Sequence, residues 1–119
     1  MSLNKTKTDP VLGQRVHDHL LSLGLETPMT SNKLTPKQKV ARIEKNFRQI
    51  METLGLDLTD DSLAETPLRV AKMYANEIFW GLDPEAFPKC TAVDNKMNYD
   101  EMVVERGVSV QSNCEHHFV

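Results

Sequence analysis

The first third of the chain shows an apolar stripe at helical spacing, followed by a polar connector. Between residues 10 and 23, apolar side chains recur at gaps of three and four, as on one face of a helix: Val11, Leu12, Val16, Leu20 and Leu23. Gly24 is a stop signal for that helix. We therefore predict a helix over residues 10–23, a loose arm over the nine residues before it, and a linker over residues 26–34.

A second helix is predicted from Thr35, where three start signals coincide. Thr35 is a good N-cap, Pro36 suits the first helical position, and Gln38 completes a capping box. The apolar stripe that follows consists of Val40, Ile43, Phe47, Ile50, Met51 and Leu54. Gly55 is expected to close the helix in the left-handed conformation.

A third helix is predicted after an acidic connector over residues 56–64. Thr66 is expected to cap it and Pro67 to occupy its first turn. Its apolar face contains Val70, Met73, Tyr74 and Ile78, and we expect it to end at Trp80 and Gly81. Two prolines over residues 82–88 then indicate a turn or an irregular loop.

The pattern changes to that of strands after residue 100. Residues 102–104 and 108–110 are rich in β-branched side chains, and residues 108–113 alternate with a period of two. Gly107 is expected to be a bulge or a bend between them. The fold class is therefore α+β, with N-terminal helices followed by the start of a sheet. Because a strand needs a partner for its backbone groups, we expect the sheet to continue in sequence beyond Val119.

Composition describes a globular chain and limits the classes of partner. The chain has 119 residues, of which 39% are hydrophobic and 26% charged, and a formal net charge of -3. The negative charge argues against a nucleic-acid surface, which needs a basic patch. No apolar stretch is long enough to cross a bilayer, and residues 1–9 lack the apolar core of a signal peptide. We therefore expect a cytoplasmic protein in which Cys90 and Cys114 are thiols or metal ligands.

The strongest chemical cluster is Cys114-Glu115-His116-His117. Cysteine and histidine three residues apart can bind one zinc ion, which acidifies a bound water when a third ligand and an open position are present. His116 is a candidate for proton transfer. The alternative is a buried thiol beside two surface histidines, because a bare C-x-x-H pattern also arises by chance. Cys90 has no neighbouring ligand, and His17 and His19 belong to the polar face of the first helix.

A second cluster places Arg69 and Lys72 three residues apart early in the third helix. Helix N-termini favour anions, so the two cations could hold a phosphate chain there. The alternative is an ordinary solvated helix face.

Together these segments resemble the GTP cyclohydrolase I family. Residues 60–74 are similar to the signature helix of that family, and residues 112–119 to its zinc and active-site motif. Residues 77–82 and 87–88 also fit, and the resemblance extends over residues 10–119, strongly from residue 57. Two specific motifs in the right order make coincidence improbable.

The resemblance implies zinc-dependent hydrolysis of GTP to formate and 7,8-dihydroneopterin triphosphate, the first step of tetrahydrofolate biosynthesis. It implies that Cys114 and His117 bind Zn²⁺, that His116 is catalytic, and that Arg69 and Lys72 hold the triphosphate, across a subunit boundary. Glu115 receives no role. The implied architecture is the tunnelling fold (T-fold), with an antiparallel sheet and a homo-oligomeric, decameric assembly. Residues 1–56 would form an N-terminal arm and helical region, and residues 57–119 the first part of the catalytic domain.

One departure from the family pattern limits this reading. The third zinc ligand in the family is a second cysteine further along, for which this sequence has no equivalent, and Cys90 does not match its place. We therefore expect the 119-residue chain alone to be inactive. The alternatives are a non-catalytic homologue that serves as an oligomerisation or adaptor module, an unrelated zinc module, and a helix-turn-helix DNA binder, which the acidic connector and the net charge oppose.

Overall fold

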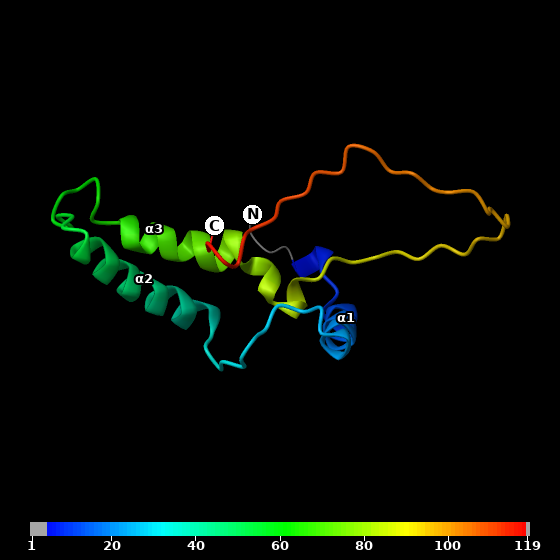
Figure 1. Cartoon of the computed structure of the whole chain (residues 1–119), viewed down its shortest axis with the longest axis horizontal. Coiled ribbons are helices and arrows are strands. Elements are labelled where there is room, and N and C mark those ends of the chain that lie inside the picture. Colours follow the sequence, from blue (N-terminus) through cyan, green and yellow to red (C-terminus); the bar gives the residue numbers. More distant parts are fainter. Residues whose placement is uncertain (1–4, 119) are drawn as a thin grey trace.

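The computed structural model describes residues 5–118 of the chain and shows three α-helices in that range. They are α1 (Pro10–Leu23), α2 (Pro36–Thr53) and α3 (Thr66–Met73), and α3 runs directly into a short π-helix, η2 (Tyr74–Ile78). Three short 3₁₀ turns complete the described elements: η1 (Lys5–Lys7), η3 (Trp80–Leu82) and η4 (Pro84–Ala86). Helix α2 lies alongside α3, α1 lies apart from them, and a long loop extends away from the helices (Figure 1). The molecule is accordingly elongated, with extents of 66 × 32 × 28 Å.

The capping box of the second helix and the glycines that close the first two helices are confirmed, and Asp9 is a further cap that the sequence analysis did not predict. Asp9 caps α1 by accepting a hydrogen bond from the Leu12 amide at 3.0 Å, and Gly24 ends α1 with φ of 66°. At α2, Thr35 and Gln38 exchange both hydrogen bonds of the capping box, at 3.3 and 2.8 Å. Gly55 has φ of 80°, the left-handed conformation that the sequence predicted.

The third helix begins one residue earlier than predicted. Thr66 is its first residue rather than its cap, and Glu65 occupies the cap position without a side-chain hydrogen bond. The proline in the first turn is as expected. The regular helix also ends earlier than the predicted Trp80, because the turn widens into the π-helix at Tyr74.

The packed region is small and lies mainly between α2 and α3. Met51 of α2 and both Pro67 and Ala71 of α3 are buried. Only part of the predicted α2 stripe is covered, since Ile50 and Leu54 remain exposed by 51% and 72%. The division at residues 56 and 57 stays a prediction, but α2 and α3, on opposite sides of it, pack together.

The N-terminal arm is not loose over residues 7–9, which corrects the prediction for that segment. The Asp9 amide donates to the Phe87 carbonyl at 2.8 Å, and the Lys89 amide donates to the Lys7 carbonyl at 3.0 Å. Thr8 and Pro88 form an antiparallel bridge between these two bonds. Residues 1–4 lie outside the described part of the chain. The pairing fixes the start of α1 against the segment of residues 87–89, which follows η4.

Helix α1 packs against η4 at a glycine. Gly13 is buried, and a Cβ atom placed on it would lie 2.0 Å from the Pro84 carbonyl oxygen and 2.7 Å from Cβ of Phe87. A side chain would therefore push α1 away from η4. This close approach needs glycine for its size, not for its backbone conformation.

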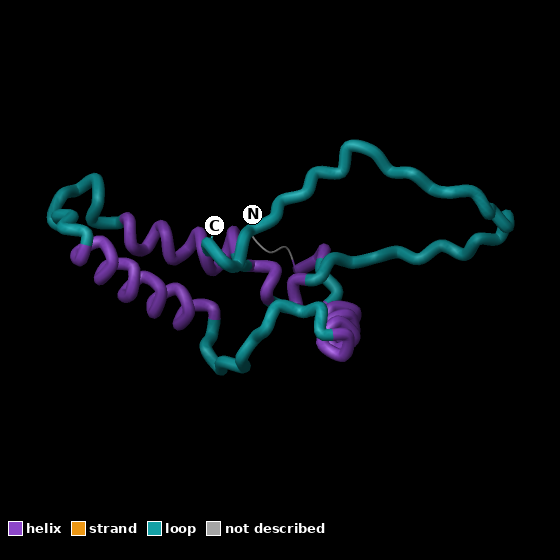
Figure 2. Tube along the Cα trace, in the orientation of Figure 1, coloured by secondary structure: helices purple, strands orange, loops and turns teal. Residues whose placement is uncertain are grey.

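The predicted strands lie in the loop of residues 91–113, which runs out and back with a turn at its tip (Figure 2). At the tip, Asn95 accepts from the Tyr99 amide at 2.8 Å and donates to the Tyr99 carbonyl at 2.7 Å. Within residues 5–118 no strand ladder forms, and apolar side chains along the loop, such as Val103 at 87%, are exposed. The sheet and the T-fold therefore stay predictions. No helix in the described range is both long and apolar enough to cross a membrane.

Candidate metal centre

The Cys-Glu-His-His segment folds into a turn that brings its thiol and imidazoles together. The Phe118 amide donates to the Cys114 carbonyl at 2.8 Å, which closes the turn over residues 114–117. Inside it, Sγ of Cys114 lies 3.4 Å from Nδ1 of His117 and 4.0 Å from Nδ1 of His116. All the side chains of the turn are exposed, so a metal ion or a substrate could reach them.

The distance between Cys114 and His117 suits two ligands of one zinc ion. Zinc bonds of about 2.3 Å to sulfur and 2.0–2.1 Å to nitrogen, at a tetrahedral angle, place the two ligand atoms about 3.5 Å apart. The observed 3.4 Å for Cys114 and His117 is close to that value, whereas the 4.0 Å for His116 is too long. His117 is thus closer to the thiol than His116, and its role as a zinc ligand stays a prediction.

The described residues supply an incomplete metal site. Among residues 5–118, no group of three or more His, Cys, Asp or Glu side chains is arranged to hold a metal ion. Cys90 lies outside the turn, exposed, with its thiol 3.6 Å from the Pro88 carbonyl oxygen. A zinc ion held as the family holds it would need a ligand in addition to Cys114 and His117.

The turn is attached on both sides to the helix that follows α3. Before it, Nδ2 of Asn113 donates to the Ile78 carbonyl at 2.9 Å. After it, the Tyr74 hydroxyl donates to the Phe118 carbonyl at 3.1 Å, and the Phe118 ring stacks on Tyr74 with centroids 5.3 Å apart. The C-terminal end of the chain accordingly lies against the end of the α3 helix (Figure 1). Sequence reasoning placed Tyr74 on an apolar face and missed this contact, because the aromatic rings are 44 residues apart.

The two cations of the second cluster lie on α3, close in sequence to this attachment. Arg69 and Lys72 are both exposed, and within residues 5–118 neither forms an ion pair or a side-chain hydrogen bond. Lys72 lies in the last turn of α3, so the expected benefit of the helix N-terminus does not extend to it. Their availability for an anion rests instead on exposure and on the three-residue spacing, which makes them neighbours.

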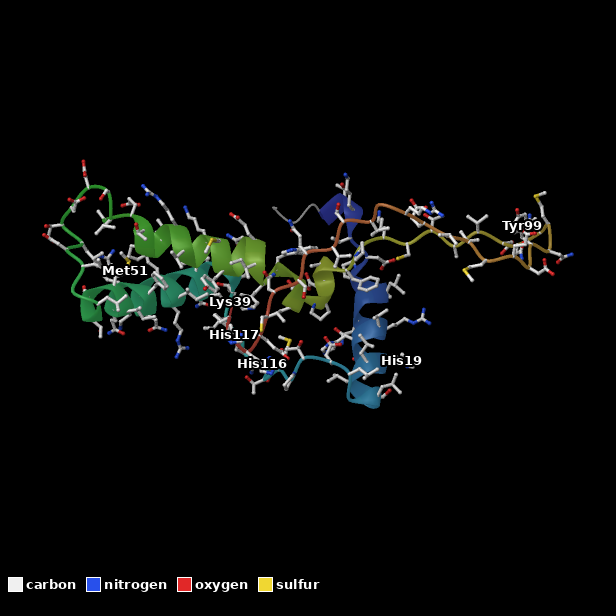
Figure 3. The ribbon with its side chains drawn as sticks, turned by 45° about the horizontal axis from the view of Figure 1, so that its top comes forward. His19, Lys39, Met51, Tyr99, His116 and His117 are labelled. Atoms are coloured by element: carbon white, nitrogen blue, oxygen red, sulfur yellow. The ribbon has the colours of Figure 1, made fainter. Side chains whose placement is uncertain are left out.

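The remaining histidines belong to α1. Nδ1 of His17 lies 3.6 Å from Oε2 of Glu26, a contact that ties the linker to α1 when the imidazole is protonated. His19 is exposed on the same helix, well separated from His116 and His117 (Figure 3). Both residues thus lie on α1 and not in the turn of residues 114–117.

Comparison with known proteins finds similarity over most of this chain. A family model described as GTP cyclohydrolase I matches residues 43–119, which includes α3 and the whole Cys-Glu-His-His turn. A "GTP cyclohydrolase 1" of Aeromonas salmonicida is 64% identical over 96 residues, covering 81% of this chain and 44% of that relative. A protein of the same name from Yersinia enterocolitica is 54% identical over 104 residues, covering 87% of this chain and 47% of the relative.

The turn of residues 114–117 brings one thiol and two imidazoles together, and α3 carries an exposed pair of cations. The chain belongs to the GTP cyclohydrolase I family. It spans about half the length of the curated relatives that it matches.

Proposed function

We propose that this chain provides the zinc-binding turn and the triphosphate-binding helix of a GTP cyclohydrolase I. The reaction is hydrolysis of GTP to formate and 7,8-dihydroneopterin triphosphate, which opens tetrahydrofolate biosynthesis. The observation that carries the proposal is the 3.4 Å approach of the Cys114 thiol to the His117 imidazole in a segment that matches the family. The proposal includes a homo-oligomeric enzyme in the cytoplasm.

Each residue of the site has a separate task in this proposal. Cys114 and His117 would hold the zinc ion together with a further ligand, and the ion would supply an acidified water for attack on the purine. His116 lies beside this pair, its Nδ1 4.0 Å from the Cys114 sulfur, and moves a proton between the reacting groups. Arg69 and Lys72 bind the triphosphate through charge-assisted hydrogen bonds and hold the base near the turn.

A chimera tests the proposal directly. Residues 43–119 would replace the matching segment of the Aeromonas salmonicida relative, and GTP-dependent formate release would be measured together with zinc content. We expect an active, zinc-containing chimera whose activity is lost in His116→Ala, while zinc is retained. The 119-residue polypeptide alone is expected to release no formate, because its described residues form no three-ligand site.

The same experiment distinguishes the catalytic proposal from the alternative, in which the chain is an oligomerisation or adaptor module. That alternative predicts a folded but inactive chimera, together with co-purification of the 119-residue chain and the intact relative. An inactive chimera that folds and assembles like its parent would overturn the catalytic proposal.

A further inference from the structure

The Cys-Glu-His-His turn has little of its own to keep it in one conformation. Its side chains are exposed, and one backbone hydrogen bond, from Phe118 to Cys114, closes it. Phe118 adopts φ of 63°, a left-handed conformation that bulky residues rarely take. Such a conformation persists only where neighbouring structure enforces it. Besides the contacts of the Cys114 thiol with the two imidazoles, contacts from outside the turn therefore contribute to its geometry.

The enforcing contacts come from the segment of residues 74–79. Phe118 lies against two rings of that segment, 5.3 Å from Tyr74 and 4.5 Å from Phe79 between centroids. The Tyr74 hydroxyl holds the Phe118 carbonyl, and the Ile78 carbonyl holds the Asn113 side chain. Asn113 before the turn and Phe118 after it are thus both held by residues 74–79.

The π-helix explains why two rings of this segment can both pack on Phe118. Residues five apart in an α-helix point about 140° away from each other. In η2 the Phe79 amide bonds to the Tyr74 carbonyl at 3.0 Å, and this wider turn brings the two rings to 5.7 Å in a stacked arrangement. Tyr74 and Phe79 therefore present one aromatic face to Phe118. Single π-turns within helices are frequent at functional sites.

We infer that Tyr74 and Asn113 are positioning residues that hold Cys114 and His117 at the separation required for a shared metal ion. The inference rests on the proposed function, since it assigns these two residues to the metal centre of that enzyme. Within residues 5–118 neither side chain forms a hydrogen bond with the thiol or the imidazoles, so each acts through the residues that flank the turn. We call the pair of contacts, Asn113 to Ile78 and Tyr74 to Phe118, the turn anchor.

The test compares metal binding in conservative variants of the purified protein. Tyr74→Phe removes the hydroxyl and keeps the ring, and Asn113→Ala removes the donor to Ile78. Matched controls are Tyr99→Phe, whose hydroxyl forms no hydrogen bond within residues 5–118, and Asn76→Ala, an exposed residue on η2. Zinc affinity would be measured by competition with a chromophoric chelator, and ligand geometry by the thiolate and d–d absorption of the Co²⁺ form.

We expect each anchor variant to lose about three- to tenfold in zinc affinity, the effect of one hydrogen bond, and to change the Co²⁺ spectrum. The controls should do neither, and helix content by circular dichroism should stay constant in all four. A second readout needs no metal: alkylation of Cys114, followed by peptide mass analysis, should change in the anchor variants while Cys90 reacts as before.

The outcomes separate this inference from the proposed function. If zinc binding depends on Cys114 and His117 but the anchor variants match the controls in affinity, spectrum and alkylation, the positioning role is wrong and the metal centre stands. If Cys114→Ser and His117→Ala leave zinc binding unchanged, the metal centre is wrong, and the positioning role is overturned with it.

Discussion

The Cys114 sulfur lies closer to the His117 ring nitrogen than to that of His116, at 3.4 against 4.0 Å. The two adjacent histidines thus lie at unequal distances from the thiol, although both follow the cysteine within one turn. This difference divides the roles of the two histidines and leads to the first prediction.

We predict that His117→Ala lowers zinc affinity by more than about tenfold, whereas His116→Ala changes it by less than about threefold. The reason is that only the His117 nitrogen lies at the spacing of two zinc ligands. Chelator competition measures both affinities. Equal losses in the two variants would contradict the assignment, and His19→Ala, on the distant α1 face, is the control.

The exposed cations Arg69 and Lys72 on α3 lead to a prediction about the binding of polyphosphate anions. We expect the double variant Arg69→Ala, Lys72→Ala to weaken binding of inorganic tripolyphosphate by about tenfold, because each cation contributes a charge-assisted hydrogen bond. Isothermal titration calorimetry at two salt concentrations would show the loss and a smaller salt dependence. Lys96→Ala, in the long loop, should bind like the unaltered protein. A double variant that binds equally well would refute the triphosphate role.

The contact between α1 and η4 predicts an unequal cost for two glycine substitutions. Gly13→Ala should lower the free energy of unfolding by about 1–3 kcal/mol, since the new Cβ would overlap the Pro84 carbonyl oxygen. Gly81→Ala should cost far less, because a Cβ there meets nothing within 4 Å. Urea unfolding of both variants measures the difference. Similar midpoints would show that α1 does not pack on this turn.

Two aspartates in the connector between α2 and α3 predict a defined pH response. The Thr59 hydroxyl and then the Thr59 amide donate to Asp57 and lower the pKa of its carboxyl below the usual 3.8, and Ser62 lowers the pKa of Asp60 in the same way. These hydrogen bonds favour the charged carboxylates. The stabilisation that they give the connector is therefore fully present at pH values above the usual pKa, and it is lost as the pH falls through the lowered pKa values. NMR titration of the carboxyl carbons should show Thr59→Val raising the pKa of Asp57 while that of Asp60 stays lowered. A raised pKa at both sites would mean that the connector unfolds as a unit.

The local features of the fold could be predicted from the sequence, but the packing could not. Asp9 was not anticipated as a cap, yet the ends of α1 and α2 fall where the apolar spacing, Thr35 and Gly55 placed them. Caps and glycine turns depend on residues within one turn of each other, so a local pattern contains them. No local pattern indicated three other features: the pairing of residues 7–9 with residues 87–89, the burial of Gly13, and the π-turn at Tyr74. They depend on residues far apart in the sequence or on small differences in backbone geometry.

The candidate site likewise has features that the sequence predicted and features that it did not. The types and spacing of Cys114, His116 and His117 indicated a metal centre before any geometry was known. The spacing could not show which histidine lies closer to the thiol, or that Tyr74 and Asn113 form hydrogen bonds on either side of the turn. These relationships depend on contacts between residues 74–79 and residues 113–118, which are far apart in the sequence.

The long loop has one further consequence for the protein. Ile78 and Asn113, which the loop joins, are 35 residues apart, and the hydrogen bond between them does not depend on the path taken by the intervening chain. The entropy of closing a flexible segment rises only with the logarithm of its length, by about 0.6 kcal/mol for each doubling. Insertions or deletions near the tip of this loop would therefore change the free-energy cost of closing it only slightly. The loop could vary in length among related sequences while the turn of residues 114–117 returned to the same place.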